Sequence, residues 1–232
     1  MEEDNKWNNV KKVLHNQLDD MSKSELFLGA YYSNMFFSDI KHVSFTLSRY
    51  KFASKLVMYQ DKIRILELGC QEAIGSLVFE QNTNLEEYVG IDFDHDAMLW
   101  NYNNLSKDKF VFIEYDFLQC DKIQNQKFNV VLSLDVIEHI DKKYEDDFCK
   151  VVSGHISDNG VAIIGTPTVY MNPYACDASK AGHINLYDQK RLYSLMNKYF
   201  NNVFIFNMND EIVNTGFAPM SCYIFAVCTG KK

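Results

Sequence analysis

The sequence predicts an α/β fold in which a mostly parallel sheet has helices on both faces, an antiparallel pair of strands at its end, and helices before its first strand. Five short β-rich runs alternate with stretches long enough to form a helix, which is typical of a parallel sheet. The last two β-rich runs have no such stretch between them, which indicates an antiparallel hairpin. Residues up to about 60 carry apolar side chains at helical spacing.

The elements follow from these patterns in order along the chain. Seven strands are expected at 63–68, 88–92, 110–115, 128–134, 160–166, 203–208 and 222–228. Helices are expected near 74–81, 94–106, 141–156 and 188–199. The chain therefore divides into an N-terminal helical appendage or lid, residues 1–60, and a sheet domain, residues 61–232. The connection 209–220 is too long for a tight hairpin between the last two strands and is expected to overhang the site.

Composition narrows the classes of function. The 232 residues are 47% hydrophobic, enough for one ordinary core, and carry a net charge of −8. This acidic balance argues against a nucleic-acid partner, because phosphate backbones are held by an excess of Lys and Arg. The six cysteines lack paired metal or redox spacing, and no stretch approaches the roughly 18 apolar residues of a membrane span. We therefore expect a cytoplasmic protein with no membrane partner.

The first chemical signal is the segment ELGCQEAIG, residues 67–75, directly after the first expected sheet strand. A strand followed by small residues and a helix start brings backbone N–H groups close to a nucleotide-like ligand. Gly69 suits the tight turn, and Gly75 allows close packing of the helix. The segment is neither a dinucleotide G-x-G-x-x-G nor a P-loop.

Carboxylates follow the next three strands. Asp92 comes 17 residues after Gly75, where an acidic side chain can accept both hydroxyls of a ribose. Asp116 follows the third strand, and Asp135 follows the fourth. Because open α/β sheets bind ligands at the carboxyl ends of their strands, these positions predict one common site.

Together these motifs resemble the class I methyltransferases that depend on S-adenosylmethionine. The resemblance covers residues 45–232 and is carried by ELGCQEAIG, VGIDFD, EYDF and SLDVIEHI, of which DVIEH is the most specific. It implies a transferase with a Rossmann-like, seven-stranded sheet. It also implies S-adenosylmethionine as cofactor and S-adenosylhomocysteine as product.

The resemblance assigns cofactor-binding roles to nine residues. Glu67, Gly69 and Cys70 are expected to line the methionine and ribose side of the cofactor, with Gly75 in the same segment. Asp92 is expected to bind the ribose hydroxyls, and Phe93, Asp116 and Phe117 are expected to contact the adenine. Leu134 is expected in the loop beneath the sulfonium. One departure is the run Gln71–Ala73, which replaces a glycine of the family pattern and leaves the path of the loop open.

The candidate catalytic residues are Asp135, His139 and His183. If a helix begins near Asp135, Glu138 and His139 share its face at i+3 and i+4. His183 lies in the segment 165–187, where this family places acceptor-binding loops. A neutral imidazole can take a proton from an acceptor hydroxyl. The alternative is that Asp135, Glu138, His139 and His183 hold a divalent metal, a pattern similar to that of small-RNA 3′-terminal 2′-O-methyltransferases.

A second resemblance indicates which class of acceptor to expect. The GHINLY run after a Thr-Pro loop resembles methyltransferases of polysaccharide and sugar modification. It implies a small acceptor, a hydroxyl of a sugar, nucleotide sugar or phosphorylated precursor in surface-glycan biosynthesis. Two alternatives stay open: a metal-dependent RNA ribose 2′-O-methyltransferase and a non-catalytic, cofactor-binding partner subunit. Nothing in the sequence predicts an oligomeric state.

Overall fold

The computed structural model describes residue 12 and the ranges 28–119 and 126–232. The helical pattern predicted around 7–14 and the start of the pattern at Leu26 lie outside the described residues. The predicted α/β fold is confirmed.

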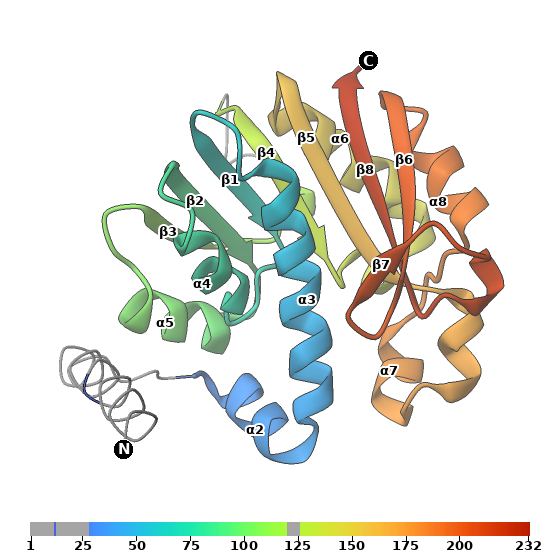
Figure 1. Cartoon of the computed structure of the whole chain (residues 1–232), viewed down its shortest axis with the longest axis horizontal. Coiled ribbons are helices and arrows are strands. Elements are labelled where there is room, and N and C mark those ends of the chain that lie inside the picture. The colour runs from blue at the N-terminus through green and yellow to red at the C-terminus, as the bar shows by residue number, and fades with distance from the viewer. Residues whose placement is uncertain (1–11, 13–27, 120–125) are drawn as a thin grey trace, which may run out of the picture.

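The sheet is built as the sequence predicts, with parallel strands first and antiparallel strands last (Figure 1). Its order is β3-β2-β1-β4-β5-β8-β6-β7. The strands are β1 (Ile63–Leu68), β2 (Leu85–Asp92), β3 (Phe110–Glu114), β4 (Phe128–Leu134), β5 (Ile156–Pro167), β6 (Phe200–Asn209), β7 (Ile212–Asn214) and β8 (Tyr223–Lys231). Strands β1 to β5 pair in parallel, and β8 lies antiparallel between β5 and β6. The carboxyl ends of β1, β2, β3 and β4 therefore meet at one edge.

The sheet has eight strands among the described residues, one more than predicted. The additional strand, β7, pairs antiparallel with β6 through Met208 and Val213. The chain reverses at Asp210, whose φ is +51°, a conformation that Asp tolerates better than most residues. As predicted, the connection 209–220 does not join β6 to β8 by a tight hairpin, but the short strand β7 within it was not predicted.

The helices are α2 (Ala30–Ser38), α3 (Ile40–Val57), α4 (Ile74–Glu80), α5 (His95–Asn104), α6 (Glu145–His155), α7 (Asp177–Gly182) and α8 (Gln189–Met196). Five 3₁₀ turns join them to the strands: η1 (Phe117–Gln119), η2 (Ile137–His139), η3 (Lys142–Tyr144), η4 (Val169–Tyr174) and η5 (Ala218–Met220). Two buried apolar clusters pack on the sheet, one on each face. Side chains of α3 and α4 join one cluster, and those of α6 and α8 join the other.

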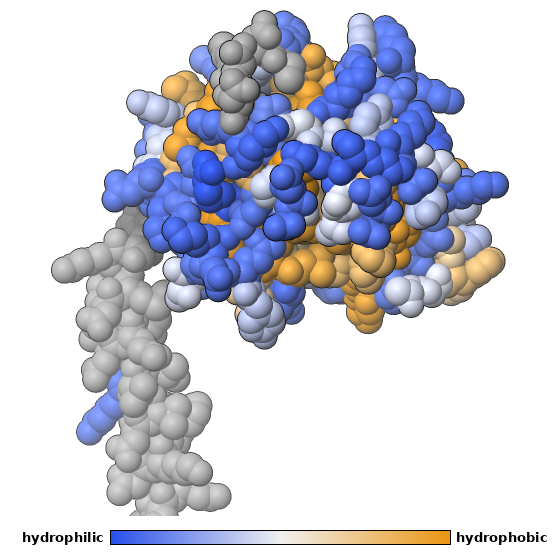
Figure 2. Space-filling view, turned by 90° about the horizontal axis from the view of Figure 1, so that it is seen from above, coloured by the Kyte–Doolittle hydropathy of each residue, from blue (hydrophilic) through white to orange (hydrophobic). Residues whose placement is uncertain are grey.

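The two ends of the sheet differ in what they carry. Figure 1 shows α2, the start of α3, and α7 at the end where β5 finishes. Figure 2 views the molecule from the opposite end, where hydrophilic side chains cover much of the surface. Within the described residues, no helix is both long and apolar enough to cross a membrane.

Candidate functional site

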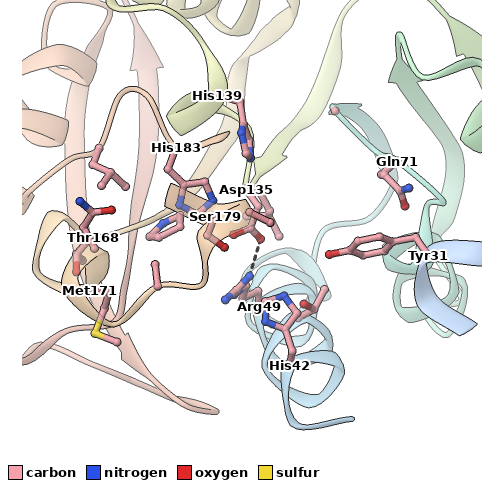
Figure 3. A pocket seen from close by; sticks show the side chains of 18 of the residues that line it. Tyr31, His42, Arg49, Gln71, Asp135, His139, Thr168, Met171, Ser179 and His183 are labelled. Carbon is pink, nitrogen blue, oxygen red and sulfur yellow. Dashed lines mark hydrogen bonds and ion pairs between the residues drawn. The ribbon is translucent and has the colours of Figure 1, made fainter. Parts of the chain in front are cut away.

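A pocket of about 520 Å³ opens at the carboxyl edge of the sheet. Its walls come from α2 and α3, from the loops after β1 and β4, and from the segment between β5 and α8. Figure 3 shows Tyr31 and Gln71 on one side, His139 and His183 on the other, and Asp135 between them. Of the predicted site residues, the pocket lining includes Gly69, Cys70, Leu134, Asp135, His139 and His183.

The loop after β1 makes a tight turn that requires glycine at its start. Gly69 has φ +77°, and a Cβ there would lie 2.3 Å from Val136, so only glycine fits without displacing the loop after β4. The backbone N–H groups of Gly69 and Cys70 both donate to the carbonyl of Ile91. At Gly75 a Cβ would lie 2.1 Å from the ring of Tyr50, so the small residue allows α3 to pack on the loop.

The departure from the family pattern in this loop has a structural role. The Glu72 side chain is buried and accepts the N–H groups of Tyr31 and Tyr32 at 2.7 and 3.0 Å, so its carboxylate caps the first turn of α2. Gln71 and Ala73 adopt positive φ, +47° and +45°. The run that replaces a glycine thus attaches the N-terminal helices to the loop.

The acidic strand ends lie behind this loop. Asp92 accepts the N–H of Gln71 at 2.9 Å, which fixes the loop on β2. Asp116 accepts the N–H of Leu118 at 3.0 Å. Phe93 is 73% exposed, and Phe117 is buried against the core residue Phe148. These four residues stand at the carboxyl edge as the strand pattern predicts, outside the lining of the pocket.

Asp135 is committed to an ion pair. Its carboxylate lies 2.6 Å from Nη1 of Arg49 (Figure 3). The Arg49 guanidinium stacks 4.0 Å from the ring centre of Tyr223. Asp135 has φ +58° and donates its N–H to the carbonyl of Gly165. The side chain is therefore turned toward α3, away from the other candidate metal ligands.

Three of the four candidate metal ligands do come together. One ligand atom each from Glu138, His139 and His183 lies within 4.8 Å of the others, and the two imidazole rings are 5.0 Å apart. Nδ1 of His139 is 2.9 Å from the carbonyl oxygen of Gly182. Since a carbonyl only accepts, Nδ1 of His139 carries a proton and donates it to Gly182.

Burial sets the charge of this cluster. Glu138 is fully buried, which, together with the nearby charge of Asp135, raises its pKa to about 8. Its Oε2 accepts the hydroxyl of Thr166 at 2.9 Å, and its Oε1 has no partner among the described residues. Partial burial and the neighbouring His139 lower the pKa of His183, which keeps that imidazole neutral at pH 7. Neither Glu138 nor His183 therefore carries a full charge near pH 7.

Comparison with known families decides which kind of protein has this site. The family model described as "Methyltransferase domain" matches residues 44–202. The chain belongs to this family. It is an enzyme that transfers a methyl group, and S-adenosylmethionine is its cofactor, as expected from the sequence.

Solved structures show the same fold at low sequence identity. The methyltransferase domain of the bacterial CtHen1-C is 16% identical, with a TM-score of 0.67, over 80% of this chain and 99% of that one. A TehB-like methyltransferase from Corynebacterium glutamicum is 14% identical, with a TM-score of 0.64, over 87% and 97%. The N-methyltransferase NodS from Bradyrhizobium japonicum, in complex with S-adenosylhomocysteine, is 13% identical, with a TM-score of 0.58, over 78% and 85%.

The methyltransferase also has pocket residues that were not among the predicted site residues. His42, Thr46 and Arg49 line the pocket from one face of α3. Burial, followed by the nearby Arg49, lowers the pKa of His42, and no hydrogen bond to its ring is formed by the described residues. The i, i+4, i+7 spacing of these polar residues in a helix marks a shared face and is the signal that could have found them.

Proposed function

We propose that the methyltransferase acts on a hydroxyl of a small sugar-type acceptor bound beside Glu138, His139 and His183. One observation carries the proposal. The pocket runs from the loop after β1, which we call the cofactor loop (residues 69–73), to this cluster. Arg49 is the one Lys or Arg among the described lining residues, and it is already paired with Asp135. Such a pocket suits a compact polar molecule better than a phosphate backbone. Helices α2 and α3 serve as its lid.

S-adenosylmethionine supplies a methyl group on a positively charged sulfur, so the reaction is an in-line displacement that leaves S-adenosylhomocysteine. The chain must bring the acceptor oxygen into line and remove the hydroxyl proton. His183, whose pKa is lowered by burial, and His139 both lie at the pocket wall, and an imidazole nitrogen there can accept that proton as the new C–O bond forms. Asp135, held by Arg49, fixes the wall between cofactor and acceptor.

A divalent metal ion fits the same cluster. Two imidazoles and one carboxylate are a donor set for first-row divalent ions, and Oε1 of Glu138 is a buried acceptor without a partner among the described residues. We propose, as the alternative to proton removal by an imidazole, that Glu138, His139 and His183 hold the ion without Asp135, since a nitrogen that binds a metal cannot also accept the proton. These residues would hold the ion beside the acceptor, where it would supply the positive charge that lowers the pKa of a hydroxyl.

The second candidate is methylation of the terminal ribose of an RNA. Two observations favour it: the cluster itself and the fold similarity to the domain of CtHen1-C. The net charge of −8 and the absence of a free Lys or Arg among the described lining residues oppose it.

Labelled S-adenosylmethionine offered with sugars, nucleotide sugars and a short RNA with a free 3′ end tests both candidates. We expect transfer to a sugar-type hydroxyl. His183→Ala and Glu138→Gln should lower turnover by roughly 100-fold or more, the usual scale for a lost acid or base, while S-adenosylhomocysteine affinity in calorimetry changes less than about twofold. His95→Ala, an exposed histidine outside the pocket lining, is the control.

Three results would count against the proposal. Transfer to the RNA alone would favour the second candidate. Full turnover in His183→Ala would assign that residue a structural role. Unchanged activity after chelation, with no bound ion, would reject the metal.

A further inference from the structure

The segment that carries His183 is fastened to the η2 turn on both sides of that residue. Before it, the carbonyl of Gly182 accepts Nδ1–H of His139 at 2.9 Å. After it, the N–H of Asn185 donates to the backbone carbonyl of Glu138 at 3.0 Å. These two bonds bring His183 to Glu138 and His139, but each depends on the path of the segment 182–187.

That path is set by a side-chain network behind the pocket, centred on Arg191 of α8. Its guanidinium donates to the carbonyl of Leu186, to Oδ1 of Asn185 and to Oε2 of Glu145, each at 2.6 Å. It also stacks 3.9 Å from the ring centre of Tyr187. One residue therefore binds three successive positions of the segment and the first residue of α6.

Two further side chains complete the network. Tyr187 is fully buried and donates its hydroxyl to Glu145 at 3.0 Å, and Asn185, 4% exposed, donates its amide to that hydroxyl at 2.8 Å. The network is buried at Tyr187 and Asn185 and partly buried at Arg191 and Glu145, and because every member is bonded, a displacement would leave a polar group unpaired. Arg191 is outside the pocket lining, so this network does not touch the acceptor.

We propose that Arg191, Glu145, Tyr187 and Asn185 form a positioning network that sets His183 against Glu138 and His139. The proposal rests on the proposed function of that cluster. It also explains why the GHINLY run is followed by an arginine six residues after Asn185: the run supplies the carbonyl, amide and ring that the guanidinium binds. The network acts through His183 and contributes nothing directly to the reacting atoms.

The test measures the cluster itself, in the full chain, with Co²⁺ as the probe. Arg191→Met keeps an unbranched apolar stem and removes the guanidinium with its donors and charge. We expect Co²⁺ affinity to fall by about 10- to 100-fold, the usual cost of losing a partner behind a metal ligand. Nuclear Overhauser contacts between the rings of His139 and His183 should be lost, and S-adenosylhomocysteine affinity should change less than about twofold.

Two variants keep the test decisive. Tyr187→Phe removes one hydroxyl without changing the packing, so it stays folded and should show a smaller loss in the same direction. Lys198→Met breaks the exposed 3.0 Å ion pair with Asp146, which also joins α6 to the end of α8 but does not contact the 182–187 segment. It should leave both readouts unchanged.

The outcomes separate this inference from the proposed function. A folded Arg191→Met protein with the Co²⁺ affinity and ring contacts of the wild type overturns the positioning role. If the wild type binds no Co²⁺, the metal proposal is rejected and the ring contacts decide: lost in Arg191→Met but kept in Lys198→Met supports the network, and kept in both overturns it.

Discussion

At the residue scale, Glu67 of strand β1 makes the stability of the fold depend on pH. It is fully buried, it accepts the hydroxyl of Tyr50 at 2.8 Å, and its Oε2 has no partner among the described residues. Burial raises its pKa from 4.5 to about 8. The folded state therefore binds more protons at this site than the unfolded state between these two values.

The sign of the pH dependence follows. Because the folded pKa is the higher one, the contribution of Glu67 to the free energy of unfolding is fully present below about pH 4.5 and declines as the pH rises toward 8. Glu67→Gln removes this decline. Denaturant unfolding without cofactor should show the variant gaining stability relative to the wild type across that range; equal slopes in both proteins would contradict the prediction.

The sequence predicted the position of a site residue well where that position depends only on the end of a strand. Gly69 and Asp135 directly follow parallel strands and Asp92 ends one, which places all three at the carboxyl edge. The ion pair between Arg49 and Asp135 joins residues 86 positions apart and depends on how α3 packs across the sheet. No local pattern encodes that packing, so the sequence placed Asp135 among the metal ligands, whereas the structure directs it toward Arg49.

At the scale of elements, α2 is held to the cofactor loop mainly by its first turn. Removing a cap costs about 0.5–2 kcal/mol, and hydrogen bonds to a charged group are worth about 1.5–3 kcal/mol. Glu72→Ala should therefore lower the free energy of unfolding by about 1–3 kcal/mol. It should also weaken S-adenosylhomocysteine binding in calorimetry, because Tyr31 and Tyr32 line the pocket from α2.

Two variants check this prediction. A Cβ at Gly29 would lie 2.1 Å from Cδ of Glu72, so Gly29→Ala should displace the same carboxylate and combine with Glu72→Ala less than additively. Asp39→Ala removes the cap that accepts the N–H of His42 at 3.2 Å and touches no part of the cofactor loop. It should cost stability without changing the affinity; a loss of affinity equal to that of Glu72→Ala would show that any weakening of these helices suffices.

At the same scale, the strands that alternate with helices were predicted closely and the last connection was not. The limits of β1 and β4 agree with the apolar runs, since both strands are buried on both faces. Strand β7 has three residues and its Ile212 is 68% exposed, so it lacks a hydrophobic pattern. Its pairing depends on the turn at Asp210 rather than on burial.

At the scale of the whole molecule, three carboxylates at the carboxyl edge of the sheet are each bonded to the N-terminal helices. Glu67 accepts from Tyr50, Glu72 accepts from the start of α2, and Asp135 pairs with Arg49. A ligand that orders this edge should therefore also order α2 and α3. The effect should include the part of α3 that lies against the sheet and away from the pocket.

Saturating S-adenosylhomocysteine tests this coupling. At about 100 times Kd, binding to the folded state adds about 2.7 kcal/mol, which raises the melting temperature of a chain of this size by roughly 5–10 °C. Hydrogen exchange should slow in the 69–76 loop and also in 30–57. In Glu72→Ala at saturating ligand, the loop should stay protected while the added protection of 30–38 is lost. Protection confined to the loop in the wild type would show that the helices respond independently, because a bond that transmits order must do so in the intact protein.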